Sequence, residues 1–358
     1  PYYPAIISEN QLINYSDLAM QTWGLVNYLQ THGVKPGDVV GLHFSSQIIH
    51  FVTALACLRL GATQISLPIN EPQIKQKRII ENYNLSSVIS DFDHQLASDR
   101  QRIIVTKLLN SPAPKKQTNN ISPTTNATYV IGSGTTGDPK CIPLTFSNLE
   151  KLIERDLAIR PMKPAERHLY PSRIDYYTTK RRAFGGLGAG ATVVMQENKG
   201  SSLLQMCERL AIDHLSLGTA QAQRLLQSIP AVKTPRLPRL KTLYVGGAPV
   251  SERLRNRLRT QINQNLCIAY GSNEFGEACI APADLQQRIP GVIGLPCPGL
   301  TVEIVDEHDS PCSANTVGYI RLKSNSLFSG YLNKPASTQK ALKSGWYYPN
   351  DFGLITND

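Results

Sequence analysis

The chain has 358 residues, 41% of them hydrophobic, so it can bury a sizeable core and general disorder is excluded. Its 25 glycines and 24 prolines are ordinary for this length and exclude collagen-like and linker-like chains. Lysine and arginine outnumber aspartate and glutamate by 37 to 27, and the resulting net charge of +10 attracts polyanions, whether nucleic acid, acidic membrane or nucleotide phosphates.

Helix and strand patterns alternate over the first ninety residues. Helices are predicted where apolar residues recur at helical spacing between capping signals, and strands where short apolar runs stand between turns. The predicted helices are 16–33, 48–60 and 74–83, and the predicted strands are 39–44, 64–67 and 87–90. This alternation predicts an α/β fold with a largely parallel sheet covered on both faces.

The next section contains a polar, proline-rich stretch at 111–126, which is typical of a long surface loop or a boundary. Strands are predicted at 128–131 and 141–144, on either side of a glycine-rich loop. Ser147 is the predicted N-cap of a helix that runs to Arg160.

A second α/β section is predicted over 168–282, and the pattern changes after Pro290. Short alternating segments at 301–305 and 318–323 indicate a small β-rich, barrel-like subdomain. The expected organisation is an α/β subdomain over 1–165, a second α/β subdomain over 166–290 and a β-rich subdomain over 291–358.

The seven cysteines are widely spaced, odd in number and form no CxxC pair. Neither a disulfide framework nor a zinc site is predicted, and scattered buried thiols in a reducing, cytoplasmic compartment are expected. No run of about eighteen apolar residues occurs, so no transmembrane segment is expected.

The glycine-rich loop at 132–140 has the strongest chemical signal and reads GSGTTGDPK. Glycines let the backbone approach a phosphate, loop hydroxyls and N–H groups can donate to its oxygens, and Lys140 adds a positive charge. A Walker P-loop is excluded, because Asp138 and Pro139 separate Gly137 from the lysine and a strand follows. A plain glycine-rich hairpin would share much of this composition.

The order of residues in this loop resembles the phosphate loop of the adenylate-forming superfamily. That family includes acyl- and aryl-CoA synthetases, luciferases and the adenylation domains of peptide synthetases. Its other motifs have counterparts in the same order at 13–18 (INYSDL), 60–62 with Pro68, 246–249 (GGAP), 269–274 (AYGSNE), 318–320 (GYI), 329–331 (SGY) and 346–351 (WYYPND). The resemblance implies the family's large N-terminal domain. The family's C-terminal domain, which carries a further lysine, is expected to be absent from this sequence.

The resemblance assigns a role to each matching residue. Lys140, Thr136 and Glu274 would be catalytic, the first two on the β- and γ-phosphates of ATP and the glutamate on Mg²⁺. Tyr270 would stack on adenine, and Asp351 would accept hydrogen bonds from the ribose. The implied nucleotide site comprises Ser133, Gly134, Thr135, Thr136, Gly137, Lys140, Gly246, Gly247, Ala248, Tyr270, Gly271, Ser272, Asn273 and Asp351, with Asn273 standing where threonine is usual.

The acid pocket is expected to involve Tyr176, Tyr177, Gly247 and Gly271. Peptide-synthetase adenylation domains carry a Phe-Asp pair at the positions that match the two tyrosines, and the aspartate there binds the amino group of the substrate. An aromatic pair disfavours an α-amino acid and favours a plain carboxylic acid. Asp175 lies close enough that a slip of one or two residues would restore the acidic group, and the tyrosines would also suit simple strand packing.

Two basic runs stand out, Lys180–Arg182 and the arginines of 253–259. The second has the pattern of an ordinary solvated amphipathic helix. Neither has the interleaved aromatics that nucleic-acid binding favours, so no nucleic-acid partner is predicted and most of the charge is expected to be solvated surface.

The expected function is activation of a fatty, aryl or other non-α-amino carboxylic acid by ATP and Mg²⁺, giving an acyl-adenylate and pyrophosphate. In the complete enzyme a thioester with CoA or with the phosphopantetheine of an acyl-carrier protein would follow. A weak or inactive module that binds a nucleotide or acyl-adenylate is the first alternative, favoured by Asn273 and by Tyr319 in place of a usual glutamate. An amino-acid adenylation domain and a basic interaction protein that has kept only the fold are the others.

Overall fold

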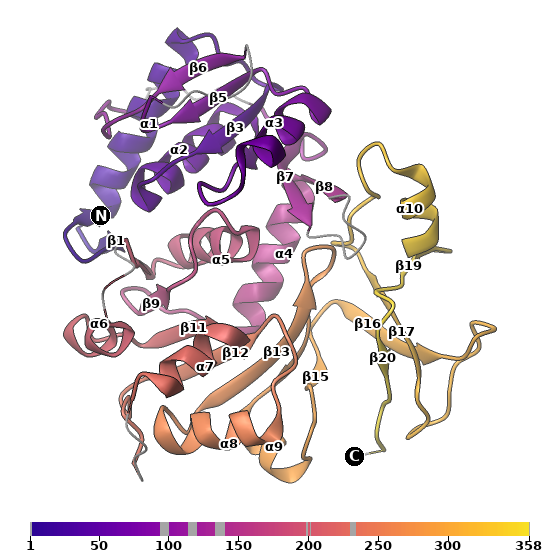
Figure 1. The fold of residues 1–358 in the computed structure, drawn as a ribbon. Helices are drawn as coiled ribbons and strands as arrows, with labels where there is room; N and C mark the ends of the chain where they lie inside the picture. The colour runs from indigo at the N-terminus through magenta and orange to yellow at the C-terminus, as the bar shows by residue number, and fades with distance from the viewer. Residues whose placement is uncertain are drawn as a thin grey trace.

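The computed structural model describes residues 2–93, 100–113, 120–132, 140–197, 200, 202–229 and 234–357. The described strands form sheets of six, nine and five strands (Figure 1). In Figure 1 the two larger sheets lie one above the other with helices between them, and the smallest sheet lies to one side. The predicted α/β architecture with a small β-rich part is therefore confirmed.

The six-stranded sheet has the order β6-β5-β3-β4-β7-β8. Its strands are β3 (Val39–His43), β4 (Thr63–Ser66), β5 (Ser87–Ser90), β6 (Gln101–Ile104), β7 (Asn126–Gly132) and β8 (Lys140–Thr145). The neighbouring helices are α1 (Tyr15–Thr31), α2 (Gln47–Leu60) and α3 (Gln73–Asn82). All neighbours in this sheet pair in parallel except β7 and β8, which are antiparallel on either side of the glycine-rich loop.

The nine-stranded sheet has the order β15-β14-β13-β12-β11-β9-β10-β1-β2. Its strands are β1 (Pro4–Ile7), β2 (Leu12–Asn14), β9 (Arg167–Tyr170), β10 (Thr192–Met195), β11 (His214–Gly218), β12 (Thr242–Gly246), β13 (Leu266–Ser272), β14 (Gly276–Ala281) and β15 (Leu295–Pro296). Its helices are α5 (Tyr177–Gly188), α6 (Leu203–Arg209), α7 (Thr219–Gln227), α8 (Glu252–Gln261) and α9 (Ala283–Arg288). Residues 4–14 belong to this sheet, although the residues that follow them in sequence form the six-stranded sheet. The predicted subdomain boundaries at 165 and 290 remain a proposal.

The smallest sheet and its helix are formed by residues 300–353. Its strands are β16 (Leu300–Val305), β17 (Gly318–Ser324), β18 (Leu342–Lys343), β19 (Trp346–Tyr347) and β20 (Phe352–Gly353), and the helix is α10 (Pro335–Ala341). The helix α4 (Phe146–Ile159) connects the two larger sheets in the chain. Its N-cap is Thr145 rather than the predicted Ser147, because the Thr145 hydroxyl accepts from the Asn148 backbone N–H and Asn148 caps in return.

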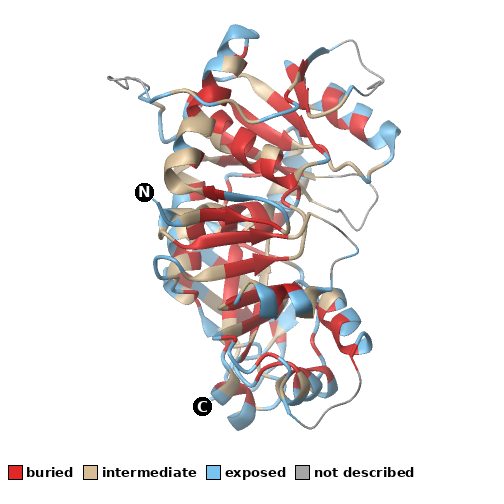
Figure 2. Ribbon diagram, turned by 90° about the vertical axis from the view of Figure 1, so that its left-hand side faces the viewer, coloured by how far each residue is buried: buried red, intermediate tan, exposed pale blue. Residues whose placement is uncertain are grey.

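The hydrophobic core is concentrated in the strands and in the helices between the two large sheets, where Figure 2 shows buried segments in red. Phe51 of α2 stacks on Phe184 of α5 with ring centroids 5.2 Å apart, which joins the helices of the two sheets. Gly61 ends α2 as predicted, in the left-handed conformation with φ of 80°. Within the described residues, no helix combines the length and the apolar character that crossing a membrane requires.

A buried polar cluster also joins α2 to the second sheet. The Nδ1 atom of His50 lies 2.9 Å from Asp175 Oδ1, and its Nε2 atom lies 3.1 Å from Lys180 Nζ. Because an ammonium group can only donate, Nε2 must accept, which leaves the neutral ring with its proton on Nδ1. Burial first, and the charge of Lys180 second, lowers the pKa of His50 to about 4, although Asp175 opposes the shift.

We expect this histidine to make the fold less stable in mild acid. An unfolded chain takes up the proton near the ordinary pKa of 6.5 and the folded chain only near 4, so acid favours the unfolded state between these values. This difference in proton binding amounts to about 2 kcal/mol between pH 7.5 and pH 5. In chemical denaturation, His50→Gln should lose that part of the pH dependence. His308→Gln, at a histidine 80% exposed, should keep it. Equal pH dependence in wild type and His50→Gln would contradict the assignment.

Candidate functional site

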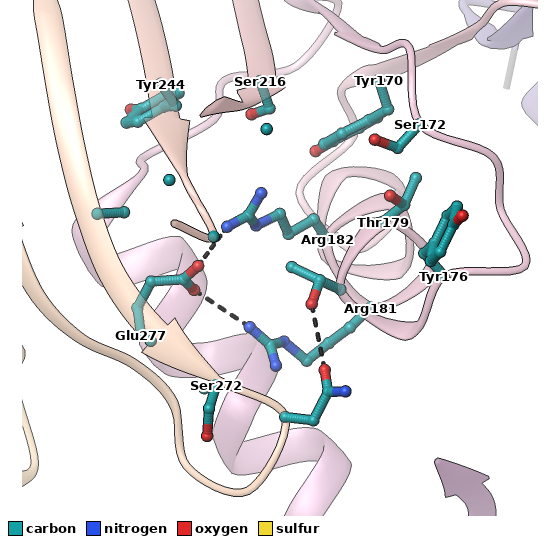
Figure 3. A pocket seen from close by; sticks show the side chains of 18 of the residues that line it. Tyr170, Ser172, Tyr176, Thr179, Arg181, Arg182, Ser216, Tyr244, Ser272 and Glu277 are labelled. Carbon is teal, nitrogen blue, oxygen red and sulfur yellow. Dashed lines mark hydrogen bonds and ion pairs between the residues drawn. The ribbon is translucent and has the colours of Figure 1, made fainter. Parts of the chain in front are cut away.

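A pocket of about 440 Å³ opens at the carboxyl ends of β11, β12 and β13 (Figure 3). Gly218, Gly246 and Ala269 line it and lie side by side in register on the three parallel strands. Side chains from the start of α5 and from β14 complete the lining. Ligands commonly bind at the carboxyl ends of parallel strands, so this pocket is the candidate site.

Glycines form part of the pocket rim because the backbone is crowded there. A Cβ atom at Gly246 would lie only 2.6 Å from the carbonyl oxygen of Ala269, and one at Gly271 would collide with the carbonyl of Gly276. Gly247 has a φ of +86°, a conformation that other residues rarely adopt. The predicted glycines therefore leave a rim free of side chains, against which a flat ligand can lie.

Tyr270 and Asp351, predicted separately for adenine and ribose, are in direct contact. The Tyr270 hydroxyl donates a 2.5 Å hydrogen bond to Asp351 Oδ2, across 81 residues of sequence. Burial and this hydrogen bond both raise the pKa of Tyr270 above its ordinary value. The end of β13 and the segment before β20 thus meet beside the pocket, which brings together one aromatic face and one carboxylate.

Glu274 and Lys140 are both held near Tyr331. The Glu274 carboxylate accepts hydrogen bonds from Ser272 Oγ at 2.7 Å and from Tyr331 Oη at 3.0 Å. The Lys140 Nζ atom lies 4.8 Å from the centre of the Tyr331 ring, within cation–π range. Sequence reasoning gave Tyr331 no role, although its segment was one of the matched motifs.

The other predicted residues occupy several positions. The loop residues Ser133, Gly134, Thr135, Thr136 and Gly137 lie outside the described residues, while Gly132 at the loop edge lines the pocket. Asn273 also lines it and accepts from Thr178 Oγ1 at 3.4 Å, at the start of α5. The Ala248 carbonyl accepts from Thr219 Oγ1 at 2.9 Å, which fixes the loop after β12.

The two tyrosines predicted for the acid pocket point to different environments. Tyr176 lines the pocket and is 62% exposed, whereas Tyr177 packs against the hydrophobic cluster around Phe275. Asp175 does not line the pocket. Arg173 donates to its carboxylate at 2.7 Å and His50 lies beside it, so this acid is fully engaged elsewhere.

A cluster of arginines around Glu277 was missed at the sequence level. The Glu277 carboxylate lies 3.2 Å from Arg160 Nη1 and accepts from Arg181 Nη2 at 3.1 Å. It also contacts Arg182 Nη2. Figure 3 marks the contacts with Arg181 and Arg182 by dashed lines. All four side chains line the pocket. Burial alone would raise the pKa of Glu277, but the three arginines hold it well below its ordinary value.

The expectation that most of the positive charge is solvated surface was wrong for several residues. Lys180 and Arg181 are buried, and Arg182 is only 16% exposed. Arg255, on the predicted solvated helix, is 4% exposed and donates to the Val292 carbonyl at 2.7 Å. These charges are tolerated inside because partners from distant segments satisfy them: acidic groups or backbone carbonyls for the arginines, and the side chains of His50, Gln64 and Ser66 for Lys180.

Comparison with known protein families shows which family the chain belongs to. Residues 1–332 match the family of AMP-binding enzymes. The chain belongs to this family. The resemblance inferred from the order of motifs is thereby confirmed.

Individual relatives of this AMP-binding chain are distant. Pyochelin synthetase PchE of Pseudomonas aeruginosa is 25% identical over 377 residues. The match covers 100% of this chain and 26% of that protein, so the chain spans about a quarter of its length. Enterobactin synthase component E of Escherichia coli is 24% identical, covering 96% of this chain and 69% of that protein. O-succinylbenzoate coenzyme A synthetase of Bacillus subtilis, solved with ATP and magnesium ion, superposes with a TM-score of 0.89 at 20% identity, covering 100% of this chain and 75% of that chain. At this identity the superposition shows the fold.

The arrangement around Glu274 fits a magnesium ion held mainly by other ligands. A carboxylate offers about four lone-pair sites, and Ser272 and Tyr331 occupy two of them, which leaves capacity for a cation. In the described part of the chain, no three His, Cys, Asp or Glu side chains gather as a metal cage. Mg²⁺ commonly takes one or two carboxylates and completes its shell with phosphate oxygens and water.

Proposed function

We propose that the protein uses ATP to convert a carboxylic acid other than an α-amino acid into an acyl-adenylate, with release of pyrophosphate. The observation that supports the proposal is that Tyr270 donates to Asp351, and that Glu274 and Lys140 both contact Tyr331, beside the pocket that Glu274 lines. The name of the Bacillus subtilis relative solved with its acyl-adenylate intermediate supports the same chemistry.

In the proposed reaction a carboxylate oxygen attacks the α-phosphorus of ATP, and the bond to the oxygen that bridges the α- and β-phosphates breaks. For this step, residues of the chain position the reactants and neutralise the charge of the phosphates. Tyr270 and Asp351 orient adenine and ribose, the glycine rim admits the reacting phosphate, and Lys140 stabilises the departing pyrophosphate. A Mg²⁺ ion held by Glu274 would supply further positive charge next to the phosphates.

The walls of the pocket favour an acid without an α-amino group. The acidic side chains among its described lining residues are Glu274 and Glu277, and both already have partners. An ammonium group would instead meet Arg182 and its neighbours, and like charges repel. Transfer of the acyl group to CoA or to a carrier-protein thiol, and a cytoplasmic location, are also part of this proposal.

Exchange of labelled pyrophosphate into ATP, in the presence of Mg²⁺ and a panel of acids, tests the function. Activity with an α-amino acid and with no other acid would overturn the substrate class. ATP binding in calorimetry without exchange would favour the alternative of a binding module.

We expect Asp351→Ala to raise the KM for ATP in this assay by about 10-fold, because a charge-assisted hydrogen bond to the ribose is lost. The matched control is Asp284→Ala, at an aspartate whose side chain is 74% exposed outside the pocket, and it should leave the KM unchanged. Equal KM values for ATP in both variants would mean that Asp351 does not bind the nucleotide.

A further inference from the structure

The deeper part of the pocket is polar, which does not suit a fatty chain. Ser216 and Tyr244 line it, and they stand two residues before Gly218 and Gly246 on the same strands. Residues two apart on a strand face the same side, so this level lies about 7 Å beneath the rim. Figure 3 shows Ser216 and Tyr170 at the opposite end of the pocket from Ser272, with Arg182 between them.

Several buried donors at this level have no hydrogen-bond partner among the described residues. The Tyr170 hydroxyl is one, although the residue is only 3% exposed. Arg182 Nε is another, and Arg160 Nε also has no hydrogen bond, although Arg160 Nη1 pairs with the Glu277 carboxylate. Buried polar groups are normally paired, so these donors point to a ligand group that accepts hydrogen bonds.

The charges around the pocket favour an anion as that group. Three arginines, Arg160, Arg181 and Arg182, face two acids, Asp156 and Glu277, in one buried cluster. The Asp156 carboxylate is already engaged by Arg181, whose Nε atom donates to it at 2.8 Å. Burial and then the charge of Arg160 lower the pKa of Arg182, so an anion beside Arg182 would relieve an unfavourable charge.

We propose that the acid substrate carries a second carboxylate, which binds to Arg182 and the Tyr170 hydroxyl while the first carboxylate reacts at the rim. A carboxylate accepts several hydrogen bonds and matches the forked guanidinium group better than a neutral tail does. The proposal rests on the adenylation function proposed above, whose substrate class it narrows to dicarboxylic acids.

Pyrophosphate exchange with matched pairs of acids tests the proposal on the full-length protein. The pairs are succinate with butanoate, glutarate with pentanoate, and isophthalate with benzoate. In each pair the first acid carries a second carboxylate where the second acid carries a methyl group or a hydrogen. We expect at least one diacid to have a kcat/KM about 10- to 100-fold above that of its monocarboxylate partner. Higher activity with the monocarboxylates would overturn the second carboxylate and leave the adenylation function standing. No exchange with any acid would overturn both.

Two variants assign the effect to the residues. Tyr170→Phe should lower the kcat/KM of the preferred diacid about 10-fold, while the kcat/KM of its monocarboxylate partner changes less than about twofold. Arg182→Gln should abolish the preference. Because Arg182 also contacts Glu277 and its loss could unfold the chain, Tyr170→Phe carries the test alone in that case. Tyr3→Phe, at a tyrosine 64% exposed outside the pocket, is the matched control. Equal losses for both members of a pair would mean that Tyr170 is structural, and would contradict its assignment.

Discussion

Replacing Glu277 with glutamine should lower the free energy of unfolding by about 3–5 kcal/mol, which is the usual loss when one partner of a buried ion cluster is removed. The carboxylate faces three arginines, and Arg160 and Arg181 are each only 1% exposed. An amide in its place would leave these guanidinium groups with Asp156 as their remaining acid, and burial raises the pKa of that acid. The loss should persist from pH 5 to pH 8, because the arginines keep Glu277 ionised throughout that range.

Urea denaturation followed by tryptophan fluorescence measures this loss. The matched control is Glu303→Gln, whose carboxylate is 34% exposed and pairs with Arg321 at 2.6 Å. A pair so close to the surface contributes about 0–1 kcal/mol, so this variant should stay near wild type. Similar unfolding midpoints for the two variants would mean that Glu277 does not compensate the arginines, and would also weaken the argument for an anion in the pocket.

Local patterns predicted much of the fold, because they depend on neighbours in sequence. The helix expected at 48–60 is α2, Gln47–Leu60, and Gly61 ends it in the expected left-handed conformation. The order of family motifs was equally informative about the site, since it assigned both Tyr270 and Asp351 to the nucleotide, and the two are in contact in the structure. Each of these inferences required only short segments and their order along the chain.

Features that depend on distant partners were not predictable in this way. Lys180 and Arg181 form part of a basic run, and nothing in that run reveals that Asp175, Asp156 and Glu277 will surround it in the interior. The pairing of β1 with β10 was not predictable either, because it joins residues 6–7 to residues 193–194, which are far apart in the sequence. Burial of a charge is decided by its partners, and here those partners come from separate elements.

Glu274→Gln should lower the rate of pyrophosphate exchange by about 10²–10³-fold, the loss expected when one preorganised group that acts on developing charge is removed. Glutamine keeps the shape, and its carbonyl oxygen can accept from one of the two hydroxyl groups of Ser272 and Tyr331 while its amide NH2 donates to the other, so the fold should survive. What it loses is the negative charge that would hold Mg²⁺ beside the phosphates. The variant should therefore need a higher Mg²⁺ concentration for half-maximal exchange.

The Mg²⁺ dependence separates a metal-binding role from a structural one. Glu307→Gln, at a glutamate 80% exposed, is the matched control and should keep both the rate and the Mg²⁺ requirement of wild type. If Glu274→Gln loses activity with an unchanged Mg²⁺ requirement, the carboxylate acts by positioning Tyr331 instead. In that case Tyr331→Phe should reproduce the loss, because glutamine weakens the charge-assisted hydrogen bond to Tyr331 and phenylalanine removes that bond.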